Sequence, residues 1–358
     1  MIKRHSAIFI VACMGGLLFS LLHLPLPWTL GPLATVIIVK IGFKQEIYWP
    51  TKIRNIGMVV LGYVMGSPFT PQTGHRMVSQ LPAMTVMTLL TILLCLLGGY
   101  VIGKYLDLHL TTSLLGSMPG GLVQMAIVCE DVEGSDAATV TLMQTVRVIT
   151  TVFFVPFLVL HGLADHVERV SRPASNISID QGPILALFAG AVIGAVYLAR
   201  YIKMPSPYLI APVVTTAVIA LSGVDAPVLP PVIIAAAQVC VGIKMGMSVE
   251  FSDLANWKKL VVLNFASVFA VIVLFLGIDY IFARISDTSF LTAFISTAPG
   301  GMNEMGLTAL MVHADLSTVI AFQLFRLIFV LLVAVPIIRW WLCRKNRACV
   351  LYSPLDQG

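Results

Sequence analysis

The stretch "TAPGGMNEMG", Thr297–Gly306, places a proline, two glycines and a glutamate inside an otherwise apolar run of the chain. Proline removes a backbone donor and breaks a helix interior, and the two glycines free the backbone. A related stretch, "SMPGGLVQMA" at Ser117–Ala126, lies 180 positions earlier and carries the same Pro-Gly-Gly. The pair predicts two interrupted helices at equivalent places in the chain.

The composition around these stretches indicates a membrane protein. Of the 358 residues, 58% are hydrophobic and only 11% are charged, whereas soluble domains carry about 25% charged residues. Apolar runs long enough to cross a bilayer, which takes about 20 residues, recur at Leu81–Gly103, Thr139–Leu163, Leu260–Phe282 and Val319–Leu342. A β-barrel would show short alternating segments instead. We therefore predict an all-α polytopic membrane protein.

The net charge of +5 does not indicate a nucleic-acid partner. The lysines and arginines lie mostly at the ends of apolar runs, where charges set the topology of a membrane protein. The densest basic cluster, Arg344 to Arg347, follows the last apolar run. We interpret it as a cytoplasmic anchor and expect the lipid bilayer to be a partner of the chain.

The chain contains two copies of one unit. Leu24–Leu33 corresponds to Met204–Val213, and Gly62–Gly66 to Gly242–Gly246, each at an offset of 180. After the acidic loop the offset becomes 179, and a second set of residues recurs there. In that set Asp136, Thr139, Gln144 and Arg147 correspond to Asp315, Thr318, Gln323 and Arg326. So many matches in one order predict two tandem homologous repeats.

The repeats divide the chain into four parts. They cover residues 1–163 and 182–343, with a polar linker at 164–181 and a basic polar tail at 344–358. Each repeat has about six apolar elements, so we expect about 10–12 membrane elements. In the first repeat they cover roughly 7–24, 28–43, 55–69, 79–103, 110–129 and 138–162. In the second they cover roughly 183–201, 207–223, 231–248, 260–283, 290–311 and 317–342.

The fifth element of each repeat holds the Pro-Gly-Gly and decides the topology. If it crosses the membrane, the repeats are parallel; if it is re-entrant, they are inverted. The distribution of Lys and Arg separates these topologies only weakly. We favour inverted repeats, because broken elements that meet at the midplane are a recurring transporter plan.

A broken helix in lipid exposes backbone groups that protein or a water-filled cavity must cover. One interpretation is that both breaks are packing elbows between helices, made of small residues. The other is that they face each other across a binding site. Polar residues accompany both breaks: Gln124 follows the first, and Asn303 and Glu304 follow the second. Ionisable groups at depth usually face a cavity, which favours the second interpretation.

Arg147 lies eleven residues after Asp136, about 16 Å along a helix at about 1.5 Å per residue. Arg326 has the same place in the second repeat, and Gln144 and Gln323 lie three residues earlier on the same face. A buried arginine needs a partner. Carbonyl groups or an internal ion pair could fill that need, or the arginines could receive an anionic substrate or counter Glu304. These interpretations are compatible and both stay open here.

The chain shows no enzyme or metal signature. There is no P-loop, no His-Glu-x-x-His and no Gly-x-Ser-x-Gly, and the six cysteines and seven histidines have no metal-ligand spacing. We therefore expect no catalytic residue, no cofactor and no metal site.

The repeated Pro-Gly-Gly followed by Asp-x-x-Thr and Gln-x-x-Arg resembles the AbrB family of bacterial polytopic membrane proteins, which is unrelated to the soluble DNA-binding regulator of that name. The resemblance covers Ile8 to Trp341 and implies a duplicated fold and a multi-pass location in the bacterial inner membrane. Family members carry labels such as regulator of gene expression and ammonia monooxygenase. The sequence has neither a DNA-binding module nor redox metal ligands. The break also resembles the unwound crossing helices of bile-acid-type sodium symporters.

We predict a secondary transporter or exporter of a small anionic or zwitterionic organic solute. The alternative is a membrane-bound regulator or sensor that affects gene expression through a partner protein. Glu304 is the predicted proton or cation coupling site, and homo-oligomerisation is left open. The predicted substrate-binding residues are Pro119, Gly120, Gly121, Gln124, Gln144, Arg147, Pro299, Gly300, Gly301, Asn303, Gln323 and Arg326.

Overall fold

The computed structural model describes most of both repeats. The described residues are 2–22, 24, 26–43, 49–120, 125, 129, 135–160, 182–202, 204, 206–247, 257–286, 288–338 and 340. The predicted linker at 164–181 and the basic tail at 344–358 lie outside them.

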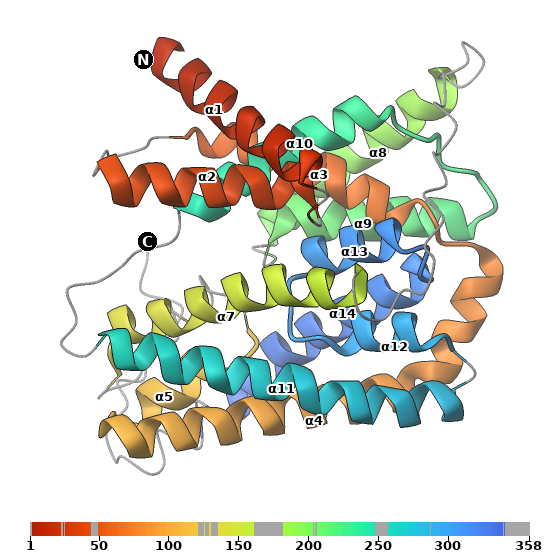
Figure 1. Cartoon of the computed structure of the whole chain (residues 1–358). Coiled ribbons are helices and arrows are strands. Elements are labelled where there is room, and N and C mark those ends of the chain that lie inside the picture. Colours follow the sequence, from red (N-terminus) through yellow and green to blue (C-terminus); the bar gives the residue numbers. More distant parts are fainter. Residues whose placement is uncertain are drawn as a thin grey trace, which may run out of the picture. The chain divides into compact units, whose positions relative to one another are not determined.

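The described residues form helices and include no strand, which confirms the all-α prediction (Figure 1). The helices of the first repeat are α1 (Ile2–Leu21), α2 (Pro27–Phe43), α3 (Thr51–Gly66), α4 (Pro71–Leu106), α5 (Leu110–Ser117) and α7 (Ala137–Leu158). Those of the second are α8 (Gly182–Tyr201), α9 (Pro207–Leu221), α10 (Pro231–Met247), α11 (Trp257–Ile285), α12 (Phe290–Thr297), α13 (Met302–Met311) and α14 (Leu316–Phe329), followed by the π-helical η3 (Val330–Ala334). They fall at the predicted apolar elements, and the fifth element of the second repeat is split into α12 and α13.

Several of these helices can cross a bilayer. Five are long and apolar enough to do so, at Met77–Leu106, Ala137–Leu158, Pro183–Tyr201, Trp257–Ile285 and Leu316–Ile338. Leu97 on α4 is 51% exposed and Leu274 on α11 is 52% exposed. Apolar faces of this extent favour lipid over water. The chain is therefore a helical membrane protein.

The chain forms two compact units, and each takes segments from both repeats. Unit 1 consists of Met1–Leu81, Phe153–Val249 and Met302–Ala321. Unit 2 consists of Pro82–Val152, Glu250–Gly301 and Phe322–Gly358. Most equivalent segments of the two repeats share a unit, but Met302–Ala321 belongs to unit 1 whereas its counterpart in the first repeat falls within Pro82–Val152 of unit 2. Neither half of the sequence is a compact body by itself.

Unit 1 is packed through glycines at equivalent positions. A Cβ built on Gly62 of α3 would lie 2.8 Å from the carbonyl oxygen of Leu209 on α9. A Cβ built on Gly242 of α10 would lie 2.5 Å from the carbonyl oxygen of Thr29 on α2. Gly62 and Gly242 are 180 positions apart, as are Thr29 and Leu209. The α3–α9 contact and the α10–α2 contact thus use equivalent residues, with the roles of the two repeats exchanged. Two units related by a two-fold axis make contacts of this kind, so the pattern supports the predicted duplication.

Replacing Gly242 with alanine should destabilise unit 1 by about 1–3 kcal/mol, because the new methyl group would overlap backbone atoms of α2. The matched control is Gly277→Ala on α11, where a Cβ meets nothing within 4 Å. It should be neutral or stabilise the protein by up to about 1 kcal/mol, since alanine is the better helix former. Thermal unfolding of the detergent-solubilised protein, followed by circular dichroism, checks both. Equal melting temperatures for the two variants would contradict the close-packing interpretation.

In unit 2 the equivalent long helices run in opposite directions. Gly98 on α4 lies against Ser267 on α11, and Ile102, one turn later, shares a cluster with Leu260, about two turns earlier. Helices α4 and α11 are therefore antiparallel, as Figure 1 also shows. Equivalent spans with opposite direction are what inverted repeats require. This geometry supports the inverted arrangement.

The repeated Asp-x-x-Thr motif begins the sixth element of each repeat. Asp136 precedes α7 and Asp315 precedes α14. Each carboxylate accepts hydrogen bonds from the backbone N–H groups two and three residues later, at 3.1 to 3.3 Å. The hydroxyl groups of Thr139 and Thr318 also donate to these carboxylates. The motif is thus an N-cap that satisfies free amides in the first turn of the helix.

Candidate functional site

Both predicted interruptions are present, at equivalent places. Helix α5 ends at Ser117 and α12 ends at Thr297, and each helix has eight residues. Pro119 and Gly120 follow the first helix without helical structure, and Pro299, Gly300 and Gly301 follow the second. The chain becomes helical again at Met302, where α13 begins. Gly121 and Gln124 lie outside the described residues.

At the first break, two side chains of α7 bind the carbonyl end of α5. Nε2 of Gln144 donates to the carbonyl oxygens of Leu115 and Met118, both at 2.9 Å. Nη1 of Arg147 donates to the carbonyl of Met118 at 2.6 Å and to that of Ser117 at 3.5 Å. Its Nη2 donates to Oε1 of Gln144 at 2.6 Å. Gln144 and Arg147 therefore act as one capping pair.

The second break repeats this arrangement with side chains of α14. Nε2 of Gln323 donates to the carbonyls of Ile295 at 3.1 Å and Ala298 at 3.4 Å. Nη1 of Arg326 donates to Ala298 at 2.6 Å, and Nη2 donates to the carbonyl of Gly300 and to Oε1 of Gln323, both at 2.5 Å. Arg326 thus reaches one carbonyl beyond the proline, which has no equivalent among the described contacts of Arg147.

The capping has a simple physical cause. The last carbonyls of a helix have no partner within it, and in a membrane interior no bulk water replaces that partner. A guanidinium group offers five N–H donors in a planar fork, so one arginine can satisfy several carbonyls. The sequence left open whether the arginines contact carbonyl groups or an anion. The described hydrogen bonds of both arginines go to carbonyl groups and to the neighbouring glutamine. An anion would have to use the donors that remain.

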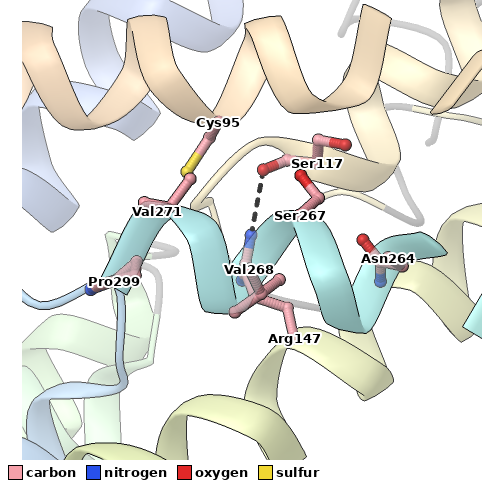
Figure 2. Close-up of a pocket in the computed structure, with 8 residues that line it drawn as sticks. All are labelled: Cys95, Ser117, Arg147, Asn264, Ser267, Val268, Val271 and Pro299. Carbon is pink, nitrogen blue, oxygen red and sulfur yellow. Dashed lines mark hydrogen bonds between the residues drawn. The ribbon is translucent and has the colours of Figure 1, made fainter. Parts of the chain in front are cut away.

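Such donors remain at the first break. Nε of Arg147 and Oγ of Ser117 are buried and have no hydrogen-bond partner within the described part of the chain. Both residues line a cavity of about 10 Å³ in unit 2, which is room for about one water molecule or one oxygen of a ligand. The dashed line in Figure 2 is the 3.5 Å contact from Arg147 to the Ser117 carbonyl. The residues that line the cavity are Cys95, Ser117, Arg147, Asn264, Ser267, Val268, Val271 and Pro299.

The cavity brings the two breaks together. Pro299 from the second break lines the same space as Ser117 and Arg147 at the first (Figure 2). Arg147 and Arg326 are near enough to repel each other electrostatically. Among the described residues, no carboxylate acts as the electrostatic partner of either guanidinium group. Two buried positive charges, one of which lines this cavity, favour an anionic group, because buried charges need compensation.

Asn303 and Glu304 belong to unit 1, where they lie in the first turn of α13. Glu304 is 4% exposed, and the side chain of Asn303 lies outside what the structure describes. A carboxylate in the first turn interacts favourably with the partial positive charge of the helix N-terminus. The position of Glu304 in the first turn of α13 fits a structural role at this helix end, and it fits a coupling role equally well.

The predicted site residues did not include six that line the cavity, and four of these carry a polar side-chain atom. Those four are Cys95, Ser117, Asn264 and Ser267. Two signals could have found some of them. Ser117 directly precedes the Met-Pro-Gly-Gly break, and Asn264 and Ser267 are three residues apart, on one face of a helix that is otherwise apolar. Among the described residues, no three His, Cys, Asp or Glu side chains are grouped so that they could hold a metal ion.

Comparisons with known proteins agree with the motifs. The family model described as "Transition state regulatory protein AbrB" matches residues 28–342. The Bacillus subtilis (strain 168) protein named "Uncharacterized protein YhjN" is 26% identical over 351 residues, covering 92% of this chain and 91% of that relative. The Escherichia coli (strain K12) protein named "Putative regulator AbrB" is 25% identical over 338 residues, covering 92% of this chain and 94% of that relative. The chain belongs to the AbrB family, as a membrane protein built of helices.

Proposed function

We propose that the chain is a secondary transporter or exporter of a small anionic or zwitterionic organic solute in the bacterial inner membrane. The observation that supports this most is the pair of buried guanidinium groups beside the cavity, without a carboxylate partner among the described residues. A structural cap alone does not need the unused Nε of Arg147 or the unused hydroxyl of Ser117. Both groups can donate to one oxygen of an anion.

The residues have separate roles in this proposal. Gln144, Gln323 and the Nη groups of both arginines hold the ends of α5 and α12 in place. Nε of Arg147 and Oγ of Ser117 bind the anionic group, and Asn264 and Ser267 also line the cavity. Glu304 serves as the coupling site. Gly120 and Gly300 give the backbone freedom at the breaks, so the end of each half-helix can move when the site opens. The proposal includes no catalytic residue and no cofactor.

The proposal is tested with purified protein in liposomes that are loaded with a mixture of small carboxylates and amino acids. We expect one or more of these solutes to leave the liposomes faster than from protein-free liposomes, as measured by mass spectrometry. Ser117→Ala removes the unused hydroxyl, and a hydrogen bond to a charged group contributes about 1.5–3 kcal/mol. The half-saturating concentration should therefore rise by about tenfold to a hundredfold. Ser222→Ala, at an exposed serine of the α9 C-cap, is the control. Equal efflux from protein-free liposomes would contradict the proposal.

A second candidate function is a membrane sensor that regulates gene expression through a partner protein. The Escherichia coli relative is named "Putative regulator AbrB", and this name favours the sensor. Both functions predict ligand binding at the cavity, so a variant with Cys95 as its only cysteine should be protected from alkylation by the ligand, since Cys95 lines that cavity. Only the transporter also predicts net flux. Protection of Cys95 without flux would favour the sensor.

A further inference from the structure

Asp279 is a buried carboxylic acid of unit 2. It lies on α11, a helix long and apolar enough to span a membrane, and it is 0% exposed. Its Oδ2 accepts a hydrogen bond from Oγ1 of Thr297 at 2.7 Å. Its Oδ1 is buried and has no hydrogen-bond partner within the part of the chain that the structure describes. One oxygen of this acid is thus held and the other is unused.

The charged groups around Asp279 are few. Helix α12 contributes no titratable side chain, and α14 contributes only Arg326. Arg326 contacts the carbonyl of Thr297 at 3.4 Å, so Thr297 lies between Arg326 and Asp279, with its hydroxyl toward Asp279. On α11 itself, Tyr280 and Arg284 are exposed and bind each other at 3.3 Å. No group in this set forms an ion pair with Asp279.

These surroundings favour the neutral acid. An ionised carboxylate in a dry interior without a cation loses nearly all of its hydration energy. A protonated carboxyl in the same place leaves at most one polar group without a partner, which is a far smaller loss. Its proton can lie on Oδ1, or on Oδ2 as a donor to Oγ1 of Thr297, whose own hydroxyl can donate to the carbonyl of Ala293 at 3.2 Å. The burial of Asp279 without an ion-pair partner is thus the environment that a proton-binding carboxyl group requires.

The first repeat has no such acid. At an offset of 180, Asp279 corresponds to Gly99 and Thr297 corresponds to Ser117. A Cβ built on Gly99 would lie 2.6 Å from Oγ of Ser117, so the two pairs occupy equivalent places. Where the second repeat has a carboxyl bonded to a hydroxyl, the first has a glycine beside an unpartnered hydroxyl that lines the cavity. Asp279 is therefore a specific addition to the second repeat and is not needed for the capping that both repeats share.

We propose that Asp279 is a proton-binding site of the transport cycle. Its carboxyl group carries a proton while it is buried, and it releases the proton when the site opens and water reaches the group. The proton moves with the anionic solute and offsets part of its charge. This inference rests on the proposed transport function and names the proton as a coupling ion, with Thr297 as the group that links Asp279 to the second break.

The first experiment does not depend on transport. Infrared spectra of the full-length protein in liposomes should show the C=O stretch of a protonated carboxylic acid, and the band should disappear reversibly as the pH is raised. Asp279→Asn and Asp279→Gly should lack this component, whereas Glu304→Gln should keep it. Asp279→Gly should fold because it introduces the residue of the first repeat, Gly99. Asp279→Asn should fold because its side-chain oxygen still accepts a hydrogen bond from Thr297. A spectrum that Asp279→Asn leaves unchanged, or a band that no pH removes from the folded protein, would overturn the proposal.

The second experiment measures flux of a solute that the liposome screen has found. Net uptake driven by a pH gradient should be lost in Asp279→Asn, while exchange of internal for external solute continues, because exchange needs no net proton release. Gradient-driven uptake at the wild-type rate in Asp279→Asn would overturn the role of Asp279 in coupling. If the wild-type protein moves no solute, the transport function fails, and the infrared titration still decides whether Asp279 binds an exchangeable proton.

Discussion

Arg326→Leu is expected to lower the free energy of unfolding by about 2–5 kcal/mol. The substitution removes the donors that satisfy the carbonyls of Ala298 and Gly300 and the side-chain oxygen of Gln323. Each buried acceptor left without a donor costs about 1–3 kcal/mol, and removal of the buried charge returns part of that loss. Thermal unfolding in detergent, together with the yield of monodisperse protein, measures the effect.

Three variants separate capping from charge. Arg284→Leu removes an exposed arginine and should change stability by less than about 0.5 kcal/mol. Arg147→Leu should cost less than Arg326→Leu, since Arg147 has no described contact equivalent to the Gly300 bond. Arg326→Lys keeps the charge without the planar fork that reaches two carbonyls at once, so its stability should be intermediate. A melting temperature of Arg326→Leu equal to that of the wild type would show that the carbonyl cap does not stabilise the fold.

Glu304→Gln is expected to abolish coupled flux of the solute and leave the fold intact. Glutamine is the residue at the equivalent position of the first repeat, Gln124, and it is tolerated in the first turn of a helix, where it can also bind free amides. The substitution keeps the size of the side chain and removes its ability to exchange a proton or hold a cation. Gradient-driven flux in liposomes and the melting temperature should be measured on the same preparation.

The combination of the two measurements decides the role of Glu304. Lost flux with an unchanged melting temperature supports coupling, whereas unchanged flux removes Glu304 from the mechanism. If flux and stability fall together, the carboxylate stabilises the N-terminus of α13, as its position in the first turn also allows. Glu304→Asp keeps the charge on a shorter stem and should retain part of the flux if the charge matters.

The periodic features of the sequence predicted the fold well. Apolar runs separated by polar or proline-rich segments predicted the places of the helices, because a segment in lipid must satisfy its own backbone groups. Most ends agree within a few residues, but α1 begins five residues and α4 eight residues before the predicted starts. The repeated Pro-Gly-Gly predicted the ends of α5 and α12, since proline and glycine act on the local backbone. Asp136 and Asp315 could also have been predicted as N-caps, because an aspartate before an apolar run is a local signal.

The partners of the buried polar groups could not be predicted in this way. Gln144 and Arg147 were predicted to face a site, but the carbonyls that they bind lie 26 to 30 residues earlier. The importance of Ser117 depends on its lying beside Arg147 in a shared cavity, and that of Asp279 on its bond to Thr297, 18 residues later. Such distances depend on which helices pack together and with what rotation, and a local pattern does not specify either.

The sequence by itself thus determined the membrane class, the places of the breaks and the residue types near them, because these depend on hydropathy and backbone freedom along one chain. It also predicted the duplication, from recurrence along that chain. The tertiary structure decided that α4 and α11 run in opposite directions, that both arginines use most of their donors on carbonyls, and that Nε of Arg147, Oγ of Ser117 and Oδ1 of Asp279 stay without described partners. The physical reason is that hydrogen-bond satisfaction in a membrane interior is a property of the packed helices together. Only their packing shows which polar atoms are left over for a ligand or a proton.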